Sequence, residues 1–344
     1  MHSGLKILRD LKTNSATDKH IVAKSLAPAL IRLSIQAILY IERAETTGRR
    51  TFALKITEFS EDEEDIPESF ASLEEARDSF NQAVNSLFRL FYLLNVDLPY
   101  SAQNETFPLH ARYNKRLAEW SISFDKFMQT NNSRLSSKEL RGAAMLKMQH
   151  MTVNIMAHAG SPKLDDPRPI AEVISELELF EPYNADFEII IKLARSLIAA
   201  SEEDSKSGKS PLNFSADLGI IGPLYYVCVK PADRTLRIAA MELLYRCQRR
   251  EGMWDSSALI PLIRSYWEIE RRHEALQDKI INENGEPVSL VKMLDLVLED
   301  GMKWEWKWKD LASTGMQAAS GYTWADVVED RTLESVRERE NNSQ

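Results

Sequence analysis

The sequence predicts an all-α fold in which helical hairpins stack around one core. Apolar residues recur every three or four positions along most of the chain, the spacing of one face of an α-helix. Two of these segments open with a serine followed three residues later by a glutamate, at Ser72/Glu75 and Ser136/Glu139. This spacing is typical of the capping box that satisfies a helix N-terminus. Helices of this kind pair and bury their apolar faces against one another.

The composition limits the classes of protein to which the chain can belong. Its 344 residues are enough for one large domain or two smaller ones. The net charge of -9 opposes nonspecific DNA binding, which depends on neutralising phosphates with Lys and Arg. Cys228 and Cys247 are too few for a disulfide framework or a four-cysteine zinc site. We therefore expect two buried thiols, no cofactor and no metal.

We also expect no membrane association. The first ten residues lack the apolar centre of a signal peptide. The longest apolar run, residues 218–229, contains Gly222 and Pro223 and is shorter than the roughly 20 residues that span a bilayer. These features predict a soluble protein of the nucleus or cytoplasm.

The first predicted helices follow in order along the chain. A helix is expected over residues 21–44, and the acidic stretch 58–68 is expected to be a solvated linker. The next helix begins after Ser72 and ends near Asn95. Shorter helical patterns cover residues 112–128 and 140–158.

Three further helices are expected in the next part of the chain. The first covers residues 186–200, and the second has Asp233 as its expected N-cap. Arg249 and Arg250 are expected in the last turn of that helix, where positive charge suits the helix dipole. Gly252 would then be its left-handed stop. The third helix, capped by Asp255 or Ser256, would run to about His273.

The C-terminal part follows a different pattern. Residues 303–309, KWEWKWK, alternate tryptophan with charge, so Trp304, Trp306 and Trp308 would share one face of a strand. Because no partner strand is evident, we expect a short extended segment laid over the helical core. Residues 1–330 are predicted to form one domain, and residues 331–344 a disordered tail.

Common catalytic motifs are missing. Residues 208–210 read Gly-Lys-Ser, but Glu203 stands where a phosphate-binding loop needs glycine. No dinucleotide glycine pattern, His-Glu-x-x-His zinc motif or Gly-x-Ser-x-Gly elbow occurs.

One helix carries a candidate pocket. His150 and His158 lie eight residues apart, about 12 Å along a helix, so they cannot both hold one small ion. Met148 and Met151 lie on the same helix, and methionine fills either a core or an adaptable pocket. Core packing is the simpler interpretation. The alternative is a pocket for an apolar metabolite, formed by Met148, Met151, His150, His158, Trp304 and Trp306.

The charged residues near the predicted helical corner allow two interpretations. Arg249, Arg250 and Glu251 stand just before Trp254 and Asp255. An arginine–carboxylate network that clamps the corner is the structural interpretation. A binding site for an anionic ligand is the functional alternative.

The stretch PADRTLRIAAMELLYRCQRREGMWDS, residues 231–256, resembles the signature of the fungal-specific transcription factor domain. Residues 2–8, 28–37, 70–77 and 223–227 resemble other segments of that family in the same order, so the resemblance covers most of residues 1–273. The signature residues are Arg237, Arg249, Arg250, Glu251, Gly252, Trp254 and Asp255.

The resemblance implies a helical regulatory region that restrains activity, senses small molecules or contacts partners. In that family the region follows a six-cysteine zinc cluster that binds DNA, and this chain has no such cluster. Its first residues resemble a segment from inside the family's domain. DNA binding by this chain alone is therefore not implied, and the resemblance implies no catalytic residues.

Three hypotheses follow. The first is a regulatory domain without a zinc cluster, which dimerises or modulates a full-length regulator. The second is an enzyme or small-molecule-binding protein of fungal secondary metabolism built on the same scaffold. The third is a truncated gene product without a separate role.

Overall fold

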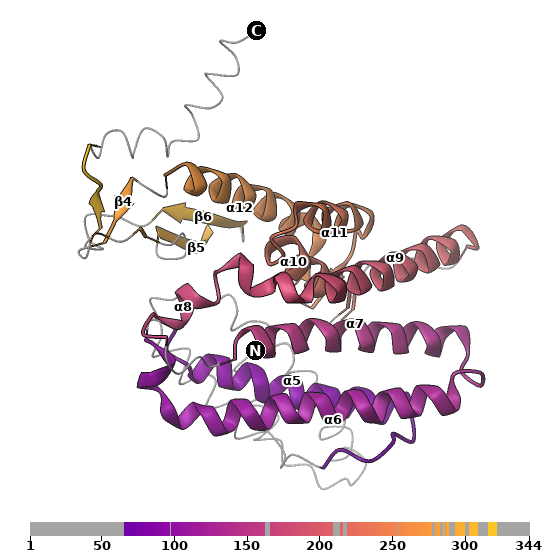
Figure 1. The fold of residues 1–344 in the computed structure, drawn as a ribbon. Helices are drawn as coiled ribbons and strands as arrows, with labels where there is room; N and C mark the ends of the chain where they lie inside the picture. The colour runs from indigo at the N-terminus through magenta and orange to yellow at the C-terminus, as the bar shows by residue number, and fades with distance from the viewer. Residues whose placement is uncertain are drawn as a thin grey trace, which may run out of the picture. The chain divides into compact units, whose positions relative to one another are not determined.

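A computed structural model describes residues 65–96, 98–161, 166–208, 214–215, 219–252, 254–276, 279–282, 285, 287–288, 293–299, 303–308 and 316–321. Helices account for 72% of the described residues, which confirms the all-α prediction (Figure 1). The chain divides into two compact units, Met1–Ile260 and Pro261–Gln344. The assignment of residues 1–330 to one domain stays a prediction. The helix expected over residues 21–44 and the tail 331–344 lie outside the described residues.

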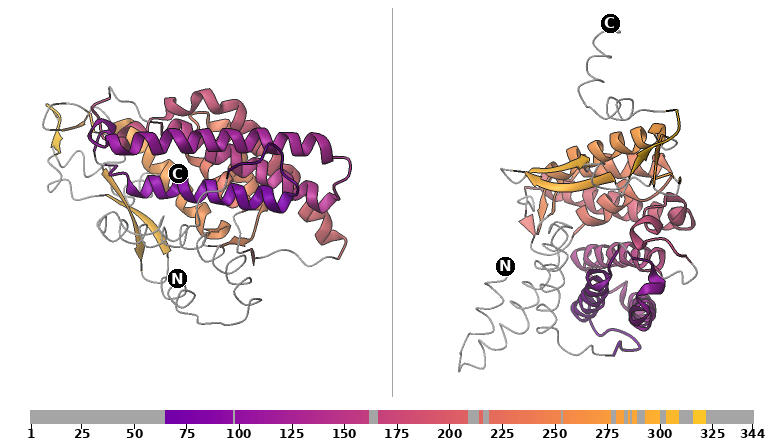
Figure 2. Two further views of the ribbon diagram at one scale, coloured as in Figure 1. Left: turned by 90° about the horizontal axis from the view of Figure 1, so that it is seen from below. Right: turned by 90° about the vertical axis from the view of Figure 1, so that its left-hand side faces the viewer.

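Three long helices form the first group of unit 1. They are α5 (Leu73–Leu93), α6 (Phe107–Asn131) and α7 (Ser137–Ala159), and the short helices η3 (Tyr100–Ala102) and η4 (Asn104–Thr106) lie between α5 and α6. Figure 2 shows α5 and α6 side by side. Their shared core contains the fully buried Trp120. Its ring stacks on Phe124 at 4.7 Å, and its indole N–H donates to the Ala76 carbonyl at 2.8 Å.

Hydrogen bonds and residue types at the helix ends explain where α5, α6 and α7 begin and end. The Ser72 hydroxyl accepts from the Glu75 N–H at 3.1 Å, whereas the Glu75 carboxylate accepts from the Ala71 N–H and not from that of Ser72. Ser136 and Glu139 form the complete capping box. The helix predicted over residues 112–128 is longer at both ends, because Pro108 suits a first helical turn and the Asn131 amide bonds to the Phe127 carbonyl.

A second group of helices packs on the other side of α7. It contains η5 (Leu177–Tyr183), α9 (Asn184–Lys206), α10 (Ile221–Val229) and α11 (Arg234–Arg246), whereas Ile170 of the short helix α8 (Ile170–Val173) joins the core of the first group. Helix α7 contacts α9 and α10 as well as α5 and α6, so it is shared by both groups. Helices α10 and α11 form a hairpin that packs on α9.

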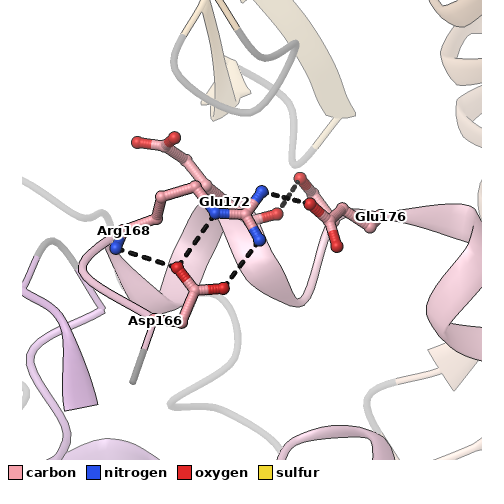
Figure 3. A network of polar contacts seen from close by, with 5 residues as sticks. Asp166, Arg168, Glu172 and Glu176 are labelled. Carbon is pink, nitrogen blue, oxygen red and sulfur yellow. Dashed lines mark hydrogen bonds and ion pairs between the residues drawn. The ribbon is translucent and has the colours of Figure 1, made fainter. Parts of the chain in front are cut away.

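The loop before α8 is braced by one arginine. The Arg168 guanidinium donates to both oxygens of Asp166, at 3.0 and 2.7 Å, and also contacts Glu176 (Figure 3). These hydrogen bonds, first to Asp166 and then to Glu176, raise the pKa of Arg168 above its ordinary value. Arg168 is an exposed residue, so we assign it a local structural role.

Short strands precede and follow α12 (Ser256–Leu276) in the sequence, and this helix contains Pro261. Before it lie β1 (Phe214–Ser215), β2 (Arg250–Glu251) and β3 (Trp254–Asp255) in one small sheet. After it, β4 (Ile280–Ile281) pairs with β7 (Gln317–Ala318), and β5 (Leu294–Glu299) pairs with β6 (Lys303–Trp308).

The tryptophan segment is extended, as predicted, but it has a partner strand that sequence reasoning missed. The β5–β6 register places Leu294, Leu296 and Leu298 opposite Trp308, Trp306 and Trp304. The other face pairs Asp295 with Lys307 and Glu299 with Lys303. Leucine favours helices, so the alternation of LDLVLE gives a weak strand signal. The Trp306 ring lies 5.6 Å from that of Tyr266 in α12.

None of the helices within the described ranges is both long and apolar enough to cross a bilayer.

Candidate functional site

The signature residues lie where α11 gives way to the β2–β3 hairpin. Helix α11 ends at Arg246, and the Cys247 N–H bonds to the carbonyls of Leu243 and Leu244. The expectation that Arg249 and Arg250 occupy the last helical turn is therefore wrong. They lie three and four residues beyond Arg246, outside the last turn in which charge acts on the helix dipole.

Gly252 also has a different role from the predicted one. It has the expected positive φ of 59° but lies in the turn of the hairpin, not at a helix end. The register pairs Arg250 with Asp255 and Glu251 with Trp254 across this turn. A left-handed residue in such a tight turn favours glycine, so the conformation was predictable although the element was not.

The Glu251 carboxylate is the centre of the corner. Its side chain is 1% exposed and forms an ion pair with Arg249, whose side chain is 19% exposed. Its two oxygens accept hydrogen bonds from the N–H groups of Ile220, at 3.1 Å, and Ile221, at 2.8 Å. Gly219 lies against it, because a Cβ on Gly219 would be 2.0 Å from Glu251 Oε1. We call these five residues the Glu251 clamp.

The clamp satisfies the N-terminus of α10. The first N–H groups of a helix lack acceptors within the helix, and negative charge is favourable beside them. Glu251 supplies both the acceptors and the charge, while Arg249 compensates the buried carboxylate. The position that an anionic ligand would take at this helix is thus occupied by the protein's own side chain. The clamping interpretation of these charges is the one that the geometry supports.

Ser256 closes the hairpin at its other end. Its N–H and hydroxyl lie 3.3 and 3.2 Å from the Arg249 carbonyl, and the Arg249 N–H donates to the same hydroxyl. Asp255 caps α12 as predicted, since its carboxylate accepts from the Ser257 N–H at 2.9 Å. The same residues that follow the clamp therefore start the next helix.

Arg237 braces the other end of α11. It is buried, and its Nε donates to the Pro231 carbonyl at 2.5 Å. Asp233 caps the helix as predicted, with its carboxylate 2.7 Å from the Thr235 N–H. Hydrogen bonding from Thr235, first from its side chain and then from its N–H, holds the pKa of Asp233 below its ordinary value.

The remaining signature residues are less enclosed. Trp254 is half-buried, and its ring lies 5.4 Å from that of Tyr225 in α10. Arg250 is exposed, with its Nε 3.3 Å from the Gly252 carbonyl. They line the corner without being buried in it.

The residues of the candidate pocket have mixed surroundings. His150 is a core residue that stacks on Trp120 at 4.9 Å, with its Nε2 2.9 Å from the Leu117 carbonyl. Burial lowers the pKa of His150 to about 4, so it is neutral near neutral pH. Met148 is also fully buried, whereas His158 is exposed.

The other pocket candidates are partly enclosed or belong to the second unit. Met151 and Trp306 are half-buried, and Trp304 belongs to β6. Core packing describes His150 and Met148.

Sequence reasoning missed the partners of Glu251. Gly219, Ile220 and Ile221 lie about thirty residues earlier in the chain. A glycine directly before a buried helix is the signal that could have indicated a close approach.

Within the described ranges, no three His, Cys, Asp or Glu side chains are placed to hold a metal ion. No protein-family model matches the chain, and neither the curated proteins nor the solved structures contain a match.

Proposed function

We propose that the chain is a regulatory domain of the fungal-specific transcription factor type that works without a DNA-binding zinc cluster of its own. The observation that carries this proposal is the signature at residues 231–256, preceded in order by the other segments that resemble the family. Its site of action is the nucleus or the cytoplasm, and its partner is another protein, a second copy of the chain or a small apolar metabolite.

The chemistry of the corner supports a scaffold role. The Glu251 carboxylate contacts three donors, two backbone N–H groups and Arg249, so its hydrogen-bonding positions serve the fold. Arg237 likewise bonds to the backbone of its own corner. Charged residues that hold the fold together suit a domain that meets its partner through surface residues and depends on this corner for its stability.

A reporter assay tests the regulatory role. The chain is fused to an unrelated DNA-binding domain in a fungal host, and reporter output is compared with that of the DNA-binding domain alone. We expect the fusion to raise or lower the output and a Glu251→Ala fusion to lose the effect, since that variant lacks the clamp. Lys192→Ala, a change at an exposed residue, is the control and should keep the effect. Unchanged output from a folded wild-type fusion would contradict the proposal.

A mobility-shift assay tests the second part of the proposal. The purified chain should form no sequence-specific DNA complex, because it carries net charge -9 and no zinc cluster. A specific complex that survives raised salt would show that the chain reads DNA itself.

A further inference from the structure

A second buried polar cluster lies where α6, η3 and the end of α7 meet. It contains Tyr100 of η3, His110 and Asn114 of α6, and Gly160 and Ser161, which follow α7. The Asn114 amide nitrogen lies 3.3 Å from His110 Nδ1 and 3.2 Å from the Ser161 hydroxyl. The Tyr100 hydroxyl donates to the Gly160 carbonyl. We call these five residues the His110 cluster.

The cluster joins residues 98–106 to the end of α7, and both segments have further ties, since the Leu98 carbonyl accepts from the Ile170 N–H at 3.1 Å and Tyr100 and Ala157 both lie in the shared core. Gly160 caps α7 through its N–H, and the Ser161 hydroxyl bonds to the Ala157 carbonyl at 3.2 Å. Tyr100 holds the short helices between α5 and α6 against this end of α7. Because these residues belong to short helices and a helix end, we expect a loss of the cluster to loosen residues 98–106 and 157–161 first.

His110 is only 2% exposed, and its surroundings suit the neutral imidazole. An amide N–H faces its Nδ1, so protonation of that nitrogen would place a donor against a donor. The other groups around it are the Phe91 ring of α5, the neutral Tyr100 hydroxyl, the Gly160 backbone and His158 of α7. Among the described residues no carboxylate faces His110 to compensate a charge.

The electrostatics agree with this geometry. Burial lowers the pKa of His110 to about 4, and repulsion from His158 adds to the shift, while the Gly160 carbonyl opposes it. Burial raises the pKa of Tyr100 to about 12, so its hydroxyl stays protonated and keeps its bond to Gly160. His110 is thus the group of the cluster that changes charge on acidification.

We propose that His110 is a proton-operated latch, whose protonation opens this end of the helical unit before the rest unfolds. His150 of α7 is also buried, but it differs from His110 because it stacks on Trp120 within the aromatic core. Protonation there requires the core itself to open. The His110 cluster touches the same core but lies beside two short helices and a helix end, which can separate locally.

The direction of the pH effect follows from the pKa of His110 in the open and the closed form. An exposed histidine has its ordinary value of 6.5, and the closed latch holds it at about 4. The open form therefore binds more protons between these values, so the latch is fully stable above pH 6.5 and weakens as the pH falls toward 4. Linkage then raises the opening equilibrium constant about 20-fold between pH 7 and pH 5.

Hydrogen–deuterium exchange tests the latch. After correction for the intrinsic effect of pH, protection of residues 98–106 and 157–161 should fall about 20-fold from pH 7 to pH 5. His110→Asn cannot ionise and keeps an acceptor near the position of Nδ1, so its protection in these segments should change less than about two-fold. Residues 187–198 of α9 should stay better protected than the latch at both pH values.

Three results would overturn the proposal. These are unchanged protection in the wild-type segments, an equal fall in His110→Asn, or simultaneous exchange of α9 with the latch. If His110→Asn does not fold, the imidazole signal of His110 is followed by NMR in the wild-type chain. The loss of protection must then follow the protonation of His110, and titration near 6.5 with intact protection would refute the latch.

Discussion

The Glu251 clamp makes the sharpest prediction about stability. Glu251→Ala removes the partner of Arg249 and the acceptor of two N–H groups at the start of α10. Breaking a buried ion pair on one side costs about 3–5 kcal/mol, and each buried donor left without an acceptor costs about 1–3 kcal/mol. Because these terms describe the same groups, they do not add fully. We expect Glu251→Ala to lower the free energy of unfolding by about 4 kcal/mol.

Urea unfolding followed by far-UV circular dichroism measures this loss. The matched control is Glu202→Ala, which removes another arginine–carboxylate pair, to Arg246, with distances of 3.0 and 2.8 Å. Both of its side chains are more than 40% exposed, so this change should cost much less than Glu251→Ala. Equal effects of the two substitutions, or a loss below about 1 kcal/mol for Glu251→Ala, would refute the reasoning from burial.

Three further predictions concern neighbouring residues and pH. Gly219→Ala should destabilise the protein by about 2–3 kcal/mol, because its Cβ would collide with the Glu251 carboxylate. Gly142→Ala, which lies in open space on α7, should stabilise it by about 0.5–1 kcal/mol. Thermal melts that rank the two variants the other way would contradict this prediction. Trp254→Ala should cost about 1–2 kcal/mol, less than the about 3–5 kcal/mol of Trp120→Ala, since only Trp120 is fully buried; equal losses in urea would show that exposure is a poor guide here. Burial holds the pKa of His150 at about 4 against 6.5 when unfolded, so its contribution is complete above pH 6.5 and about 3 kcal/mol is lost as the pH falls toward 4. A His150→Gln variant should therefore show a shallower acid dependence of unfolding, and an identical profile would show that His150 is not responsible.

Local sequence rules predicted much of the helical part. The Ser136–Glu139 capping box and the Asp233 cap depend on residues two or three positions apart, so the sequence contains all of the interacting groups. The apolar periodicity of residues 72–95 likewise reports on one helix face. Such features need no knowledge of distant contacts.

The corner shows where local rules stop. Gly252 was recognised as left-handed, but whether it ends a helix or turns a hairpin depends on pairing with Trp254 and Asp255. The role of Glu251 depends on amides about thirty residues away. The pairing of β5 with β6 also depends on a register that the alternation of leucine alone does not fix.

A double-mutant cycle on Arg249 and Glu251 tests most directly whether the signature is a structural brace. Arg249→Met removes the guanidinium, and Glu251→Gln removes the charge while keeping an acceptor for the α10 N-terminus. Free energies of unfolding of the two single variants and the double variant then give the coupling energy. We predict a coupling of about 2 kcal/mol or more, because both side chains are mostly withdrawn from water. A coupling below about 0.5 kcal/mol would mean that the pair does not hold the corner together.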